Sequence, residues 1–265
     1  MKGRNQPIAL TIGGSDSSAQ AGVQADLRTF AALDVHGMCA FTALTIQNHE
    51  RVLHTESLAP SLLKQQIQSM LRAFSVRAIK TGMLVSASHV EILATTLESE
   101  TNAPLVVDPV LSATSGARLL DEEGEQAMVR LLLPNADVFT PNLPEAIHLT
   151  RCPPDTPPAE LAEACASLLS AKGVVVLKGG HSGDPQHSTD LVRLPNGVLF
   201  RLDAPRIETT ASRGTGCTFS AAIAAGLAKG LSPDEAARNA KRYITGALAH
   251  GVTLRDGRGP VGQLW

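Results

Sequence analysis

The sequence predicts an α/β protein built on a mostly parallel sheet, and three observations support this fold class. Short apolar runs rich in β-branched residues alternate with amphipathic stretches of helical period, as in strands covered by helices. Most of these runs are continuously apolar, as strands buried on both faces require. The chain has 265 residues, 43% hydrophobic and 18% charged, which is enough to fill a large core. We therefore expect a single domain over residues 1–265.

The predicted parallel strands are six short apolar runs. They cover residues 8–12, 38–45, 78–81, 105–107, 138–140 and 174–177. Two further runs, 191–194 and 198–202, are joined through Pro195-Asn196-Gly197, the spacing of a β-hairpin. The hairpin predicts an antiparallel edge on the parallel sheet.

Two stretches have the apolar stripe of a packed helix, residues 62–74 and 236–248. The second has a clear beginning, because Ser232 and Glu235 form a capping box and Pro233 suits the first helical position. The proline-rich segment 151–158 is a candidate linker, but the strand and helix pattern resumes after it unchanged. We interpret it as a loop within one domain.

Composition limits the possible partners. The chain carries 23 Lys and Arg against 25 Asp and Glu, and only 3% of its residues are aromatic, so neither a nucleic-acid partner nor a membrane surface is expected. The uncharged stretch 214–228 is shorter than the roughly 18 residues of a spanning helix. No export signal is visible, and the four cysteines form no Cys-x-x-Cys pair. These features predict a cytoplasmic protein with a small ligand.

The segment Arg213-Gly214-Thr215-Gly216-Cys217-Thr218 leads directly into a small-residue helix, residues 219–229. Two glycines let successive backbone N–H groups point at one spot, and the helix N-terminus adds about half a positive charge there, so the segment predicts an anion hole. In the first helical turn the dipole favours the thiolate of Cys217, which could accept a proton from an attacking hydroxyl. The alternative is a buried cysteine that packs as a small hydrophobe.

A second glycine-rich turn, Gly13-Gly14-Ser15-Asp16, follows the first predicted strand and precedes a helix with Gln24 and Asp26. Ligands of open α/β sheets bind beyond the carboxyl ends of the strands, so this turn is well placed to contact one. Asp26 could equally be a solvated helix carboxylate. Neither a Walker A pattern nor Gly-x-Gly-x-x-Gly is present.

Acidic and basic residues follow three of the later strands. Asp108 and Glu145 are expected at the same edge of the sheet, where a carboxylate pair can hold magnesium against phosphate oxygens. Asp108 also belongs to an Asp-Pro turn, and Asn142 with Glu145 reads equally as a capping box. Lys178 could hold a phosphate or be an exposed lysine at a strand end. The residues alone leave these alternatives open.

Eight motifs occur in a characteristic order. They are Ala9-Leu10-Thr11-Ile12-Gly13-Gly14-Ser15-Asp16, Gly22-Val23-Gln24-Ala25-Asp26, Ala43-Leu44-Thr45-Ile46-Gln47-Asn48, Lys80-Thr81-Gly82-Met83, Asp108-Pro109-Val110, Thr140-Pro141-Asn142-Leu143-Pro144-Glu145-Ala146, Leu177-Lys178-Gly179-Gly180 and Gly214-Thr215-Gly216-Cys217-Thr218. From about residue 8 to residue 260 the chain resembles the hydroxymethylpyrimidine and phosphomethylpyrimidine kinases of thiamine biosynthesis, a branch of the ribokinase superfamily.

This resemblance implies a Rossmann-like three-layer α/β/α fold of the ribokinase type and a homodimer. It also implies ATP with Mg²⁺, and phosphorylation first of the hydroxymethyl group and then of the resulting monophosphate. The site residues that it implies fall into four groups. Cys217 is the base, and the amides of Gly214, Thr215 and Gly216 stabilise the transferred phosphoryl group. Asp26 and Gln47 bind the pyrimidine, in a pocket whose wall is formed by Gly14, Met83 and Val110. Lys178, Asn142 and Arg213 bind ATP, and Asp108 and Glu145 hold magnesium.

The chain departs from the family pattern at two places. Ala19-Gln20 stands where the family commonly has Gly-Gly, and Arg213 stands where it commonly has His. Sugar-kinase relatives usually carry Asp at the position of Cys217, which argues against a sugar substrate. Two rival functions remain, a pyridoxal or pyridoxine kinase of the same branch and a non-catalytic pyrimidine-binding descendant. Gln47-Asn48 favours the pyrimidine, and Lys178 with the turn 214–217 favours catalysis.

Overall fold

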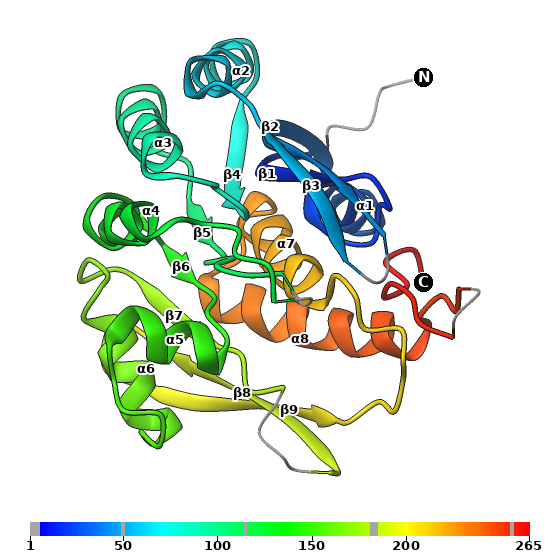
Figure 1. The fold of residues 1–265 in the computed structure, drawn as a ribbon. Helices are drawn as coiled ribbons and strands as arrows, with labels where there is room; N and C mark the ends of the chain where they lie inside the picture. The colour runs from blue at the N-terminus through cyan, green and yellow to red at the C-terminus, as the bar shows by residue number, and fades with distance from the viewer. Residues whose placement is uncertain (1–5, 49–50, 114–115, 181–184, 255–256) are drawn as a thin grey trace.

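The computed structural model describes residues 6–48, 51–113, 116–180, 185–254 and 257–265. Over these residues the chain forms one nine-stranded sheet in the order β3-β2-β1-β4-β5-β6-β7-β8-β9, with helices on both faces (Figure 1). The predicted α/β class and the three-layer arrangement are confirmed.

The middle of the sheet is parallel, as predicted. Its strands are β1 (Ile8–Asp16), β2 (His36–Gln47), β4 (Val76–Thr81), β5 (Leu105–Val107), β6 (Val138–Phe139) and β7 (Val174–Leu177). Residues 105–107 and 174–177 keep their predicted bounds, and β4, β5 and β7 are buried over most or all of their length. Continuous apolar runs therefore predicted the doubly covered strands well.

Both edges of the sheet are antiparallel. The predicted hairpin is present as β8 (His187–Arg193) and β9 (Leu199–Pro205), and β8 pairs with β7. The opposite edge, β3 (Val52–Ser57) paired with β2, was not predicted. β3 is half-buried or exposed throughout and has the mixed sequence Val-Leu-His-Thr-Glu-Ser, so no apolar run marks it.

The helices divide between the two faces, each with its own apolar core. One face holds α2 (Pro60–Ala73), α3 (Ala87–Glu100), α4 (Glu122–Ala127) with the short π and 3₁₀ helices Met128–Leu132 and Leu133–Asn135, α5 (Leu143–Thr150) and α6 (Pro158–Ala166). The other holds α1 (Gly22–Ala32), α7 (Thr215–Ala228) and α8 (Pro233–Ala249). In Figure 1 α7 and α8 lie side by side, and α7 packs against β4, β1 and β5.

Details of the predicted helices are partly corrected. α8 has the predicted capping box of Ser232 and Glu235. In α2 the buried residues are Leu63 and Ile67, whereas Leu62 and Phe74 from the predicted stripe are 44% and 50% exposed. The stripe was read too broadly, because a helix at the edge of a layer buries a narrow face. No helix within the described ranges is long and apolar enough to span a bilayer.

Candidate active site

A cavity of about 560 Å³ lies where the parallel strands end. Asp16, Gln47, Met83, Asp108, Asn142 and Lys178, at or just after the ends of six strands, all line it. Every site residue expected from the sequence is among its lining residues. They are Gly14, Asp26, Gln47, Met83, Asp108, Val110, Asn142, Glu145, Lys178, Arg213, Gly214, Thr215, Gly216 and Cys217. The fold thus brings the eight separate motifs to one place.

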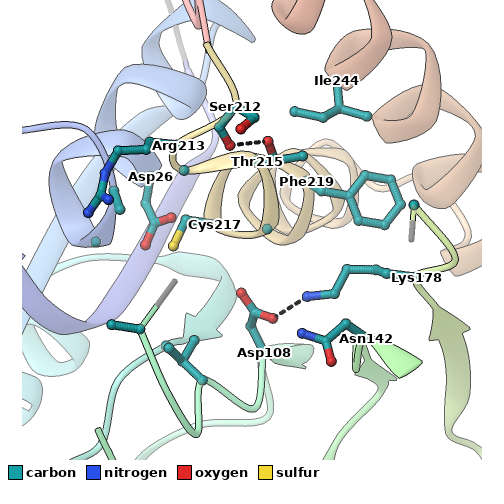
Figure 2. A pocket seen from close by; sticks show the side chains of 18 of the residues that line it. Asp26, Asp108, Asn142, Lys178, Ser212, Arg213, Thr215, Cys217, Phe219 and Ile244 are labelled. Carbon is teal, nitrogen blue, oxygen red and sulfur yellow. Dashed lines mark hydrogen bonds and ion pairs between the residues drawn. The ribbon is translucent and has the colours of Figure 1, made fainter. Parts of the chain in front are cut away.

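The glycine-rich turn before α7 forms one wall of this cavity (Figure 2). Gly214 has φ +78°, and a Cβ there would lie 2.1 Å from the Gln20 carbonyl oxygen, so only glycine fits. The Thr218 N–H donates to the Gly214 carbonyl at 2.8 Å and closes the first turn of the helix. The earlier amides of the helix have no intrahelical acceptor, which is the arrangement that binds anions at a helix N-terminus.

Lys178 extends toward this turn from the other side of the cavity. A Cβ on Gly216 would lie 3.5 Å from the Lys178 Nζ, so the ammonium is adjacent to the helix N-terminus. Lys178 Nζ donates to Asp108 Oδ1 at 2.8 Å, and Ser220 Oγ donates to the other oxygen at 3.0 Å. Burial opposes ionisation of Asp108, but Lys178 and Lys80 outweigh it and lower the pKa of this carboxyl. The pair is therefore charged, and an ammonium at this place could bind a phosphate.

Cys217 is half-buried in the first turn of α7, beside Asp26 in Figure 2. Burial raises the pKa of its thiol to about 11, with Asp26 and Asp108 adding to the rise and Lys80 and the Gly22 amide opposing it. The expectation that the helix N-terminus makes Cys217 a thiolate is therefore wrong for the protein without substrate. Poor solvation of the thiolate, and then the charges of two nearby carboxylates, favour the thiol.

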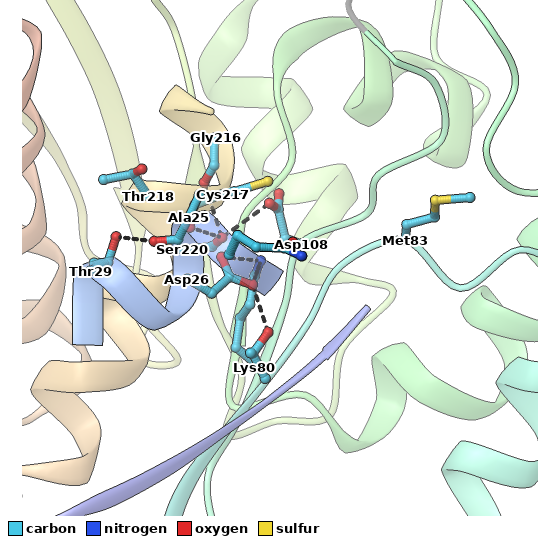
Figure 3. A network of polar contacts seen from close by, with 12 residues as sticks. Ala25, Asp26, Thr29, Lys80, Met83, Asp108, Gly216, Cys217, Thr218 and Ser220 are labelled. Atoms are coloured by element: carbon cyan, nitrogen blue, oxygen red, sulfur yellow. Dashed lines mark hydrogen bonds and ion pairs between the residues drawn. The ribbon is translucent and has the colours of Figure 1, made fainter. Parts of the chain in front are cut away.

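Asp26 belongs to a buried polar network, shown in Figure 3. Its two oxygens accept from Lys80 Nζ at 2.8 and 2.7 Å, and Thr11 Oγ1 donates to Oδ2 at 2.6 Å. The alternative of a solvated helix carboxylate is therefore wrong. Burial works against the charge on Lys80, but Asp26 more than offsets it and raises the pKa of this lysine. The sequence reasoning quoted Lys80 only inside a motif and gave it no role.

Asn142 and Glu145 form the capping box that was left open as an alternative. Asn142 Oδ1 accepts from the Glu145 N–H and Glu145 Oε2 accepts from the Asn142 N–H, both at 2.8 Å. Burial raises the pKa of Glu145 to about 7, with Asp108 adding to the rise and Lys178 opposing it. The capping role does not remove Glu145 from the cavity, because its carboxyl remains close enough to Asp108 to feel that charge.

Magnesium fits this part of the site. Asp108 and Glu145 supply oxygen donors at one edge, and Mg²⁺ in proteins is commonly held by one or two carboxylates together with waters and substrate phosphates. Within the described ranges no cluster of three or more His, Cys, Asp or Glu could hold a metal by itself. A cation here would therefore depend on the phosphates of a bound nucleotide.

The segment 13–16 is a strand rather than a turn. Ser15 and Asp16 continue β1 beside Leu44 and Thr45, after a bulge at Gly13 and Gly14. The turn follows at residues 17–21, where the Asp16 carboxylate accepts from the amides of Ser18, Gln20 and Ala21. Ala19 has φ +55°, a left-handed conformation that glycine adopts more easily.

The far end of the cavity was missed by sequence reasoning. Apolar side chains from α7, α8 and the loop after β9 line it, namely Ile207, Phe219, Ile244 and Leu248. Ile244 and Leu248 were read as part of a packing stripe, and they do lie on the inner face of α8. A signal was available in Lys241, a charged residue that shares this face with Ala237, Ile244 and Leu248 at helical spacing.

Comparisons with known proteins agree with this site. The family described as Phosphomethylpyrimidine kinase matches residues 16–262. A hydroxymethylpyrimidine/phosphomethylpyrimidine kinase of Streptomyces coelicolor is 42% identical over 98% of this chain and 95% of its own length. Among solved structures, a Staphylococcus aureus pyridoxal kinase in complex with AMP-PCP and pyridoxal gives a TM-score of 0.87 at 33% identity, covering 98% of this chain and 94% of the other.

A phosphomethylpyrimidine kinase of Clostridium difficile gives a TM-score of 0.78 at 34% identity, with 91% of this chain and 99% of the other covered. The resemblance inferred from eight motifs is thus confirmed over nearly the whole length. Since the family match spans most of the chain and the site carries each of its motifs, the protein belongs to the phosphomethylpyrimidine kinase family.

Proposed function

We propose that this protein uses ATP to phosphorylate 4-amino-5-hydroxymethyl-2-methylpyrimidine, and then phosphorylates the monophosphate to the diphosphate, in thiamine biosynthesis. The observation that carries the proposal is the position of Lys178 beside the N-terminus of α7, within one cavity that also contains Gln47 and Cys217. Residues suited to phosphate therefore line the same cavity as polar residues such as Gln47 and apolar residues such as Phe219 and Ile244. The names of the relatives fit this reaction.

The apolar end of the cavity suits the nucleotide. A flat base can lie among Ile207, Phe219 and Ile244, while Lys178, Asn142 and Arg213 are proposed to contact the rest of ATP. The amides of Gly214, Thr215 and Gly216 would stabilise the charge on the transferred phosphoryl group.

The polar end suits the pyrimidine. The Gln47 amide can both donate to and accept from the ring edge, and Gly14, Met83 and Val110 are proposed to form the wall. In the proposed roles Asp26 also faces the ring, although Lys80 and Thr11 already donate to its oxygens. The contribution of Asp26 would then come mainly from its negative charge and the orientation that Lys80 gives it.

In the first reaction the substrate hydroxyl oxygen bonds to the γ-phosphorus of ATP, the bond to the β,γ-bridging oxygen breaks, and ADP leaves. We assign the hydroxyl proton to the Cys217 thiolate, which forms when the thiol first releases its own proton to water in the cavity; accepting the hydroxyl proton then restores the thiol. The second reaction needs no such base, because a phosphate monoester has already lost most of its second proton at pH 7. Asp108 and Glu145 would hold Mg²⁺, which neutralises the phosphate charges when bound.

One experiment tests the function and its nearest rival. ADP release is measured with Mg²⁺ and three acceptors in parallel, namely the hydroxymethylpyrimidine, its monophosphate and pyridoxal. We expect the highest kcat/KM with the pyrimidines. A higher value with pyridoxal would favour the second candidate, for which the likeness to the pyridoxal kinase of Staphylococcus aureus gives a specific reason. No ADP formation with any acceptor would support the non-catalytic alternative.

The proposal also covers the domain organisation, the oligomeric state and the localisation of the protein. We propose that residues 1–265 act as a single domain, in a homodimer, in the cytoplasm. Light scattering on the purified protein measures the mass directly, and a monomer at micromolar concentration would contradict the dimer.

A further inference from the structure

A buried ion pair that has no proposed role so far lines the same cavity. Lys241 Nζ of α8 donates to Asp190 Oδ2 of β8 at 2.8 Å and to Ser188 Oγ at 3.1 Å. Both charged side chains are more than nine-tenths buried, and both line the cavity. Buried charges of this kind are costly unless their contacts are well arranged, so the pair calls for a reason.

The second carboxylate oxygen of Asp190 holds the turn that follows Lys178. Asp190 Oδ1 accepts from the Gly179 N–H at 2.9 Å, directly after Lys178. A Cβ on Gly179 would lie 2.1 Å from the Thr189 carbonyl oxygen, so the backbone of this turn presses against β8. Arg206 Nη1 donates to the Gly180 carbonyl at 2.9 Å from the other side. The turn 178–180 is therefore fixed by side chains as well as by the sheet.

α8 connects this turn to the opposite wall of the site. It packs closely on α7, since a Cβ on Gly226 would lie 2.8 Å from the Ala236 Cβ. The N-terminus of α7, at Gly216, lies beside the Lys178 ammonium. The ion pair of Lys241 and Asp190 thus connects α8, which packs on α7, to the turn that carries Lys178.

We propose that Asp190 and Lys241 are positioning residues that keep the Lys178 turn (residues 178–180) at the correct distance from the N-terminus of α7, and so determine the affinity for ATP. This proposal rests on the proposed function, because it takes Lys178 as a ligand of the ATP phosphates. It assigns no substrate contact to Asp190 or Lys241. Small displacements of a positioned group can cost as much as 10²-fold in rate, so loss of the pair should be measurable.

The test compares four variants with the parent. Lys241→Met removes the ammonium, Asp190→Asn with Lys241→Met removes both charges while keeping an acceptor for Gly179, and Lys241→Arg keeps the charge. Lys172→Met is the matched control, because Lys172 is exposed in the loop before β7. Each is assayed for KM of ATP, KM of the pyrimidine, kcat and Tm, and ADP binding is measured by calorimetry.

We expect Lys241→Met and the double variant to raise the KM of ATP and the Kd of ADP by about 10-fold or more, while the KM of the pyrimidine stays within about twofold. Lys241→Arg should recover most of this loss, and Lys172→Met should change nothing. If Tm falls but the KM of ATP and the Kd of ADP do not change, or if both KM values rise equally, the pair only stabilises the fold and the proposal is wrong.

The double variant guards against misfolding, because it leaves no unpaired charge in the interior. The ADP titration separates this proposal from the proposed function. A parent protein that releases no ADP with any acceptor counts against the kinase reaction. The calorimetric Kd values of the parent and the variants would then decide the role of Asp190 and Lys241 without turnover.

Discussion

Two lysine–aspartate pairs lie at the carboxyl edge of the sheet and differ in their access to the cavity. Lys80 and Asp26 are 1% and 2% exposed, and both Asp26 oxygens are bound by the same ammonium. Lys178 is 15% exposed beside Asp108 at 3%, and only one Asp108 oxygen accepts from it. Asp108 has further donors in Ser220 and Thr140, so it stays satisfied when the lysine moves.

The difference indicates that the two pairs contribute differently to stability and to activity. In the Lys80 and Asp26 pair both carboxylate oxygens are bound by the ammonium, and removing one partner would leave a buried charge without compensation. An ammonium that is partly open to the cavity, as in Lys178, can instead form charge-assisted hydrogen bonds to a phosphate. We therefore expect Lys80 to affect mainly stability and Lys178 mainly activity, and the following predictions test or refine that division.

Lys80→Met should have the largest effect on stability. The substitution leaves the Asp26 carboxylate buried with Thr11 as its remaining side-chain donor, and loss of one partner of a buried pair costs about 3–5 kcal/mol. Urea unfolding monitored by circular dichroism measures this loss. Adding Asp26→Asn should recover part of it. Equal stability of Lys80→Met and the parent would show that the pair does not support the fold.

Lys178→Met should reverse this pattern. We expect kcat/KM for ATP to fall by about 10²- to 10³-fold, the range for loss of one donor to transition-state charge. The free energy of unfolding should fall by less than in Lys80→Met, because Ser220 and Thr140 still donate to Asp108. Steady-state kinetics and urea unfolding on the same preparation make the comparison. A larger stability loss in Lys178→Met would remove the distinction between the two pairs.

The residues of the cavity that belong to short motifs could be predicted from the sequence, whereas its apolar end could not, and the reason is physical. Gly214, Asp108 and Lys178 stand at strand ends or helix beginnings, where short motifs are diagnostic. Ile244 and Lys241 instead come from the middle of a helix, where a residue that lines a cavity looks like one that packs in the core. Only the placement of α8 against the sheet distinguishes the two.

The fold shows the same limit. Continuous apolar runs predicted the six parallel strands, because burial on both faces leaves a strong signal. The edge strand β3 is mostly exposed, and its sequence carries no such signal. The raised pKa of Cys217 could not be predicted from the sequence either, since it depends first on burial of the thiol and then on Asp26 and Asp108, which lie far away in the sequence.

Cys217 experiences the charges of both pairs, and it should affect one reaction more than the other. We expect Cys217→Ala to lower kcat for the hydroxymethylpyrimidine by about 10²-fold, the lower end for a general base, because phosphoryl transfer depends mostly on positioning. The monophosphate brings its own ionised oxygen, so its kcat should change by less than about threefold. Unchanged kcat for the hydroxymethyl substrate, with chemistry rate-limiting, would favour a packing role.

A substitution at Gln47 tests the pyrimidine end of the cavity, where neither lysine is proposed to contact the substrate itself. Gln47→Met keeps the size of the side chain and removes the amide, and the ring groups that it satisfies would be left unpaired. We expect the KM of the pyrimidine to rise by about 10- to 100-fold, as 1–3 kcal/mol of lost polar contact gives, with the KM of ATP nearly constant. Equal changes in both constants would place Gln47 outside the substrate pocket.

The smallest expected effect concerns Glu145, whose carboxyl lies near the Lys178 and Asp108 pair. Its pKa is raised from 4.5 to about 7 in the folded protein, so as the pH rises from about 4.5 to 7 the unfolded chain releases this proton first and stability falls. Above pH 7 the penalty is constant. Glu145→Gln keeps an oxygen acceptor for the Asn142 N–H and cannot ionise.

We therefore expect Glu145→Gln to have a higher Tm than the parent at pH 8, where the parent bears the full cost of ionising Glu145, and nearly the same Tm at pH 4.5. Differential scanning fluorimetry across this pH range measures the difference between the two proteins, in which the other carboxyls cancel. The KM of Mg²⁺ should rise in the variant. A Tm difference independent of pH would mean that Glu145 ionises with its ordinary pKa, and that burial and the charge of Asp108 do not disfavour its ionised form.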